Sequence, residues 1–193
     1  VTLSPMSLSF TSVGDTATHT PTVKDAGGAV ISGATVTWAT SSSSVATVSS
    51  AGLVTAVANG TATITATSGS ASATATTTVS QTASSVTLSP TSLSFTSVGD
   101  TATHTPTVKD AGGAVISGAT VTWATSDTEV ATVSSAGLVK AVANGTATIT
   151  ATSGSASATA TATVSQVISS VTLSPTSLSF TSVGDTATHT PTV

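Results

Sequence analysis

Hydrophobic and polar residues alternate with a period of two over most of the chain. Segments such as "TVTWAT" (35–40) and "TATITAT" (61–67) place larger apolar residues at alternate positions, the pattern of strands with one buried face. Turn-forming residues separate these segments, as in "DAGG" (25–28) and "NG" (59–60). The pattern predicts an all-β chain of short strands.

Over residues 1–85, strands are predicted near residues 1–4, 7–12, 16–23, 34–40, 45–48, 53–58, 61–67 and 71–80. Short strands with a turn about every 8–12 residues are typical of an antiparallel sandwich. Buried positions are predicted at Leu3, Leu8, Phe10, Val13, Ala17, Val23, Val36, Trp38, Val45, Val48, Val54, Val57, Ile64, Ala66, Ala73, Ala75 and Val79. Pro21 cannot donate a ladder hydrogen bond, so the strand at 16–23 is expected at a sheet edge.

The sequence repeats itself with a period of 85 residues. "VTLSP" begins at Val1, Val86 and Val171, the first two copies differ at eight positions, and residues 171–193 are identical to the start of the second copy. This period suits one small sandwich domain better than one turn of a solenoid. We therefore expect domains like beads on a string at 1–85 and 86–170, followed by a partial third domain at 171–193.

The order of motifs within a repeat is specific. "VTLSPTSLSFTSVGDTAT" followed by "ATVTWATSDTEVATVSSAGLVKAVANGTATITATSG" resembles the bacterial immunoglobulin-like domain of group 2. The resemblance covers both full repeats and the start of the third. It implies tandem immunoglobulin-like antiparallel β-sandwiches of bacterial surface proteins, adhesins and some phage structural proteins, which act as spacers or adhesive modules. It carries over no catalytic residue.

Composition disfavours several other classes of protein. Only 5% of residues are charged, against about 25% in ordinary domains. Ser and Thr interrupt every apolar run before the roughly 18–20 residues that span a bilayer, so no membrane-spanning segment is expected. A net charge of −4 with no Arg disfavours nucleic acid as a partner. The chain has no Cys and therefore no disulfide.

No residue pattern points to an enzyme, a cofactor or a bound metal. Each repeat has one His, and Asp15 would lie roughly 13 Å from His19 along a strand rising about 3.4 Å per residue. A packed His19 is therefore expected rather than a ligand or a general base. The segments that join the repeats, 80–85 and 165–170, contain no carboxylate, which disfavours Ca²⁺ between domains.

Asn59 and Asn144 lie in "NGT", which fits the N-glycosylation pattern. A two-residue hairpin turn also prefers Asn-Gly, because both residues take positive φ, and this turn explains the motif without sugar. The Ser/Thr-rich faces leave O-linked sugar open as an alternative.

Residues 171–193 contain apolar side chains that a few strands cannot bury alone. Three explanations stay open: a window cut from a longer array, a segment that completes a neighbouring subunit by strand addition, and a frayed end. Contacts between subunits or domains would then involve Leu173, Leu178, Phe180, His189 and Val193.

Low charge and hydroxyl-rich strands favour close packing and self-association, as a homopolymer or a continuous repeat array. The sequence therefore predicts a structural protein, a repetitive segment of an extracellular surface filament, fibre or stalk. The alternative is an adhesive module that binds glycans or a receptor. Exposed aromatic or Arg side chains at a domain tip would favour this alternative. Trp38 and Trp123 occupy alternating strand positions and are therefore expected in the core.

Overall fold

The computed structural model describes all residues 1–193 and consists of strands joined by turns and loops. The chain divides into two compact units, one formed by residues 1–89, 105–124 and 150–159, the other by residues 90–104, 125–149 and 160–193. The predicted all-β class is confirmed.

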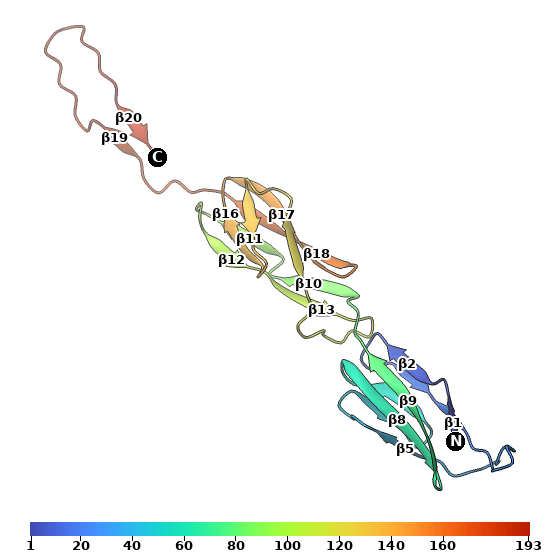
Figure 1. Cartoon of the computed structure of the whole chain (residues 1–193). Coiled ribbons are helices and arrows are strands. Elements are labelled where there is room, and N and C mark those ends of the chain that lie inside the picture. Colours follow the sequence, from blue (N-terminus) through green and yellow to red (C-terminus); the bar gives the residue numbers. More distant parts are fainter. The chain divides into compact units, whose positions relative to one another are not determined.

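The first repeat contributes nine strands. They are β1 (Thr2–Ser4), β2 (Ser7–Phe10), β3 (Thr16–Thr18), β4 (Thr20–Thr22), β5 (Thr37–Thr40), β6 (Ala46–Val48), β7 (Leu53–Ala56), β8 (Gly60–Ser68) and β9 (Ala71–Val79). Two sheets, in the orders β2-β9-β8-β5 and β3-β7-β6, form the sandwich, and β1 pairs with β4. Figure 1 shows β9, β8 and β5 side by side in the first unit.

The second repeat has the same strands in the same sheets. They are β10 (Ser85–Ser89), β11 (Ser92–Phe95), β12 (Thr101–Thr103), β13 (Thr105–Lys109), β14 (Thr122–Thr125), β15 (Ala131–Val133), β16 (Leu138–Ala141), β17 (Gly145–Ser153) and β18 (Ala156–Val164). The sheet orders are β11-β18-β17-β14, β12-β16-β15 and β10-β13. Near-identical sequences thus give identical topology.

Alternation along β8 and β9 builds the core of the first repeat. Ala62, Ile64 and Ala66 on β8 are buried, whereas Thr61, Thr63 and Thr65 face outward opposite threonines of β9. The main cluster joins both sheets: Phe10, Ala46, Val54, Ala56, Ala62, Ile64 and Val79. The outer face of β8 and β9 therefore presents threonine hydroxyl groups.

One strand pair per repeat departs from the antiparallel pattern. β2 runs parallel to β9, with Ser7 opposite Thr76 and Phe10 opposite Val79, and β11 repeats this pairing with β18. Alternation fixes which face of a strand is buried but carries no information about the direction of its neighbour.

The strand predicted at 16–23 is interrupted at His19. The His19 N–H donates to Gly52 O (3.0 Å), and the ring Nδ1 lies 2.8 Å from Pro5 O. Because a carbonyl only accepts, Nδ1 carries the proton. The His19 side chain is fully buried and stacks on Trp38, which confirms the packed interpretation. β4, which contains Pro21, pairs only with β1, as predicted for an edge.

Two local predictions are wrong. Val57, predicted to be buried, is 40% exposed. It follows the end of β7, and its N–H donates to Val45 O. The Asn-Gly turn is also not of the predicted type, because only glycines have positive φ, Gly60 at 145° among them. Asn59 therefore has another role, described below.

Gly52 and Gly69 test how tightly the His19–Trp38 stack is packed. Both have left-handed φ, so alanine at either should cost about 1–2 kcal/mol of backbone strain. A Cβ at Gly52 would also lie 2.6 Å from His19 O and 2.7 Å from Trp38 Cζ2, whereas one at Gly69 meets nothing within 4 Å. Gly52→Ala should therefore lower the free energy of unfolding by about 1–3 kcal/mol more than Gly69→Ala does.

The measurement is urea denaturation followed by tryptophan fluorescence, with Trp123→Phe in both variants so that Trp38 alone reports. Equal losses of unfolding free energy would contradict the packing described for Gly52.

Candidate functional site: a carboxylate joint between repeats

The residues predicted to make strand contacts lie in the second unit and are largely uncovered. Leu173 is 49% exposed, Phe180 55% and Val193 74%. Leu178 is half-buried and His189 is exposed. The equivalent Phe10 of the first repeat is 6% exposed.

This segment forms a sheet of its own, in which β19 (Thr172–Ser174) pairs with β20 (Thr190–Thr192). The His189 ring contacts Pro175 O at 2.7 Å, as His19 contacts Pro5 O. The hydrogen bond between the His ring and the Pro carbonyl of the first strands thus forms here as well. The role of these residues as strand contacts stays a prediction.

The structure holds no group of three or more His, Cys, Asp or Glu side chains close enough to bind a metal ion. None of its segments is a helix long and apolar enough to cross a membrane. Among the buried polar residues of the structure, Asp110 is the only one that carries a charge.

Asp110 opens the "DAGG" loop of the second repeat, as Asp25 does in the first. Asp25 Oδ1 accepts hydrogen bonds from the N–H groups of Gly27 and Ala29, both at 2.9 Å. Asp110 Oδ1 accepts one from Ala114 N–H at 2.9 Å. The carboxylate thus folds its own loop, in the segment that the sequence predicts to be a turn.

The second oxygen of Asp110 contacts the first repeat. Oδ2 accepts a hydrogen bond from Gln81 Nε2 at 2.7 Å and one from the Val13 N–H at 3.0 Å. These residues belong to the first unit, and Asp110 is 3% exposed there. We call this set of contacts the joint.

Asn59 holds Gln81 in position. The Gln81 N–H donates to Asn59 Oδ1 at 2.7 Å, which fixes the backbone from which the Gln81 side chain reaches Asp110. The Asn of the "NGT" motif is therefore a bracing residue in this structure. We call the segment that joins the two repeats, residues 80–85, the linker. It makes a further hydrogen bond to the second repeat, because the Ser84 N–H donates to Lys109 O at 2.8 Å.

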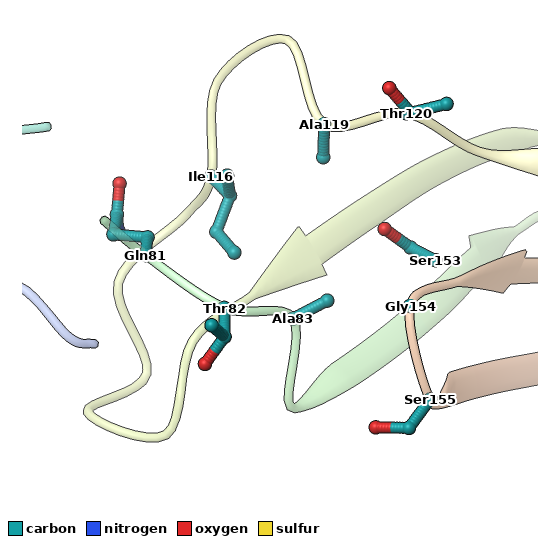
Figure 2. Close-up of a pocket in the computed structure, with 9 residues that line it drawn as sticks. All are labelled: Gln81, Thr82, Ala83, Ile116, Ala119, Thr120, Ser153, Gly154 and Ser155. Carbon is teal, nitrogen blue, oxygen red and sulfur yellow. The ribbon is translucent and has the colours of Figure 1, made fainter.

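The linker crosses an open pocket beside the joint (Figure 2). Ala83 and Ile116 point toward its centre, and Gly154 lies in the β17–β18 turn opposite the linker. A Cβ at Gly154 would lie 3.9 Å from the Ala83 Cβ. Small residues thus let the linker pass close to this turn.

Gly112 allows the loop to approach the first repeat. A Cβ there would lie 3.1 Å from Val13 O and 3.5 Å from the Ser12 Cβ, whereas a Cβ at the equivalent Gly27 meets only its own loop, at Asp25 Oδ1. Neither glycine has positive φ. At Gly112 the need is therefore for space rather than for an unusual backbone conformation.

Hydrogen bonds lower the pKa of Asp110 below its ordinary value of 3.8. The bond from Gln81 has the largest effect, the bond from the Val13 N–H follows, and burial opposes both. Each donor favours the ionised form, so the joint holds a carboxylate that stays charged.

The two repeats provide an internal comparison, because the joint residues recur at equivalent positions. Asp25 is exposed whereas Asp110 is buried, and Ser97 is exposed whereas Ser12 is buried. Gln81 is half-buried and Gln166 exposed. Since the residues are identical, the burial comes from the joint itself.

The sequence alone does not predict the joint, because the segments that join the repeats contain no carboxylate and the aspartates of the turns are separated from them along the chain. The carboxylate enters from a loop that lies 29 residues beyond Gln81. A usable signal was present, since "DAGG", "NG" and "SQ" recur in every full repeat, but their convergence depends on the fold.

Comparisons with known proteins found one family model and several solved structures similar to this chain. The family described as bacterial Ig-like domain (group 2) matches residues 3–79 and 82–164. Among solved structures, domains 1–6 of the surface layer protein SbsC are 26% identical, with 81% of this chain and 24% of that chain covered and a TM-score of 0.43. This chain thus spans about a quarter of that structure.

Two adhesin structures are also similar. The Yersinia pseudotuberculosis adhesin InvE is 15% identical over 84% of this chain and 57% of that chain, with a TM-score of 0.44. The Escherichia coli adhesin FdeC is 18% identical over 85% and 63%, with a TM-score of 0.41. No curated protein matches the chain.

Alanine substitutions at Gly112 and at Gly27 should distinguish the effect of contacts in the joint from effects within the loop alone. At Gly27 alanine should leave the free energy of unfolding unchanged or raise it by about 0.4–1 kcal/mol, because it reduces the entropy of the unfolded chain. At Gly112 the contact with Val13 O should cancel this gain and destabilise by about 1–3 kcal/mol. Urea denaturation of both variants measures the difference, and equal stabilities would contradict the close approach.

The joint should weaken in acid. Because the folded-state pKa of Asp110 is lowered, the carboxylate contributes stability that is present above its ordinary pKa and is lost as pH falls through the lowered value. NMR titration of the Asp110 carboxyl carbon should therefore give a midpoint below 3.8. A midpoint at or above 3.8 would contradict the hydrogen bonds assigned to Oδ2.

Proposed function

Because the chain belongs to the bacterial Ig-like domain family, group 2, we propose that it is a structural segment of an extracellular surface filament, fibre or stalk. Each 85-residue repeat is one domain in this proposal, with domains at 1–85 and 86–170 and a partial one at 171–193. Its function is mechanical and spatial, and no catalytic step is assigned to it.

The observation that carries the proposal is the joint. Asp110, Gln81 and Val13 hold the loop of one repeat against the end of the preceding one. A freely swinging linker would need no buried carboxylate between repeats, whereas a spacer of defined length benefits from a braced connection. The recurrence of all joint residues supports a device repeated along an array.

The surface of the repeats supports assembly rather than isolation. The outer face of β8 and β9 pairs Thr61 with Thr78 and Thr63 with Thr76, and it carries no charged side chain. Hydroxyl groups can hydrogen-bond to a neighbouring surface without the desolvation cost of an ion. Self-association is therefore part of the proposal, and glycans are a second class of partner for the same hydroxyl-rich face.

Strand complementation is the less favoured way to connect subunits. Residues 171–193 are identical to residues 86–108, so a donated segment would displace a segment with the same side chains. The exchange buries Leu173 and Phe180 only by exposing Leu88 and Phe95, which are 7% and 5% exposed. Its net free energy is near zero, which gives no drive toward a polymer.

Electron microscopy of the native material at neutral pH tests this proposal. We expect regular fibres or stalks on or outside the cell, with an axial repeat that matches one or two domains. Short, separate particles at every concentration, or localisation inside the cell, would contradict it. A screen against immobilised glycans would then test the adhesive alternative.

A further inference from the structure

We propose that the parallel pair of β2 and β9 is a shear clamp, the element that keeps the repeat folded when the chain is pulled from both sides. The equivalent clamp of the second repeat is the pair of β11 and β18. The inference rests on the proposed structural function and adds to it the ability to bear tension, together with the strands that bear it.

Tension along an array reaches the clamp from opposite directions. The second repeat is continuous with the chain on both sides, through residues 80–85 before it and residues 165–170 after it. β11 lies near the start of this repeat, and β18 is its last strand. A pull from both sides therefore draws β11 toward its N-terminal end and β18 toward its C-terminal end.

The parallel direction decides how the hydrogen bonds are loaded. The N-terminal end of β11 and the C-terminal end of β18 lie at opposite ends of the ladder, so the two forces slide one strand along the other. All bonds between the strands then share the load and must break together. In an antiparallel pair the same two ends would lie side by side, and the pull would open the ladder one bond at a time.

Further backbone hydrogen bonds lengthen the clamp beyond the four residue pairs of each ladder. In the first repeat the donors are the N–H groups of Thr76, Ser80 and Thr82, and the acceptors are the carbonyl oxygens of Met6, Phe10 and Thr11, at 3.2, 2.9 and 3.0 Å. The second repeat has the same bonds at 3.2, 2.9 and 3.1 Å. The clamp thus reaches into the linker, the segment through which tension leaves the first repeat.

The inner face of the clamp is closed to water. Phe10 of β2 lies opposite Val79 of β9, and the two side chains, 6% and 2% exposed, belong to the main core cluster. Water that could replace a strained hydrogen bond is kept from this side, and sliding the strands moves buried side chains past the core. The chain has no Cys, so these noncovalent contacts carry the tension without a disulfide.

A buried contact holds the corner through which tension enters the clamp. β1 pairs with β4 over three residues, and Pro5 follows β1 directly. The carbonyl of Pro5 accepts the hydrogen bond from the fully buried His19 ring, and His104 makes the same contact with Pro90 at 2.7 Å. If β1 separates from β4, this corner stays attached to the core, and the tension passes to β2 along its axis.

Single-molecule force measurements on residues 1–193 test the clamp by changing only the direction of the pull. One handle is attached at Met6→Cys in both variants, at a side chain that is 76% exposed just before β2. The second handle is attached at Thr82→Cys for a sliding pull, or at Thr74→Cys, beside the start of the ladder, for a peeling pull. Thr82 and Thr74 are exposed, and the chain has no Cys of its own.

The two directions should differ in force. At the same loading rate, the variant with handles at 6 and 82 should need at least about twice the force of the variant with handles at 6 and 74, because forced unfolding follows the unfolding rate and only the sliding pull loads all bonds at once. Both variants should have the same urea midpoint, since exposed substitutions change stability little. This control shows that the difference comes from the direction of the pull.

Equal forces in the two directions, or a larger force for the peeling pull, would overturn the clamp. The proposed function would survive that result, because a spacer that is not under tension needs no clamp. Regular fibres in the microscope together with equal forces would thus separate the failure of the clamp from the failure of the proposed function.

Discussion

The carboxylate of Asp110 is the constraint on which the connection between repeats depends. It is the only buried charged side chain in the structure, and a buried charge is tolerated only when hydrogen bonds replace its lost hydration. Its loop amides serve one oxygen, while Gln81 and Val13 serve the other. Removing any one of these donors leaves the charge less well compensated, so the loop, the linker and the end of the first repeat must be positioned together.

The repeats supply the joint at little cost to their own folding. Asp25 shows that the loop forms without a neighbour, and Gln166 shows that the bracing by Asn also forms alone. Each half is therefore rigid before the two meet, which reduces the entropy lost when they do. Together with outer faces that carry hydroxyl groups instead of charge, this arrangement suits an array in which identical units are added one after another.

Much of the fold follows from the sequence, because alternation decides which side chains are buried. Ile64 and Val54 are fully buried as expected, and the strand limits differ from the predicted ones mainly at their ends. The parallel pairing of β2 with β9 and the break at His19 do not follow, since they depend on contacts with Val79 and Gly52 that are distant in sequence. The joint is the extreme case: Asn59 reads as a turn residue and Asp110 as a loop residue, and only the fold brings them to Gln81.

Hydrogen exchange of the Val13 and Val98 amides in the unmodified protein tests the central claim most directly. The two residues occupy the same position in identical sequence, and only the Val13 N–H donates to a buried carboxylate, while Val98 is 47% exposed. The account predicts that the Val13 amide exchanges far more slowly than the Val98 amide at neutral pH. Equal exchange rates would contradict it, because they would mean that Asp110 does not hold the first repeat.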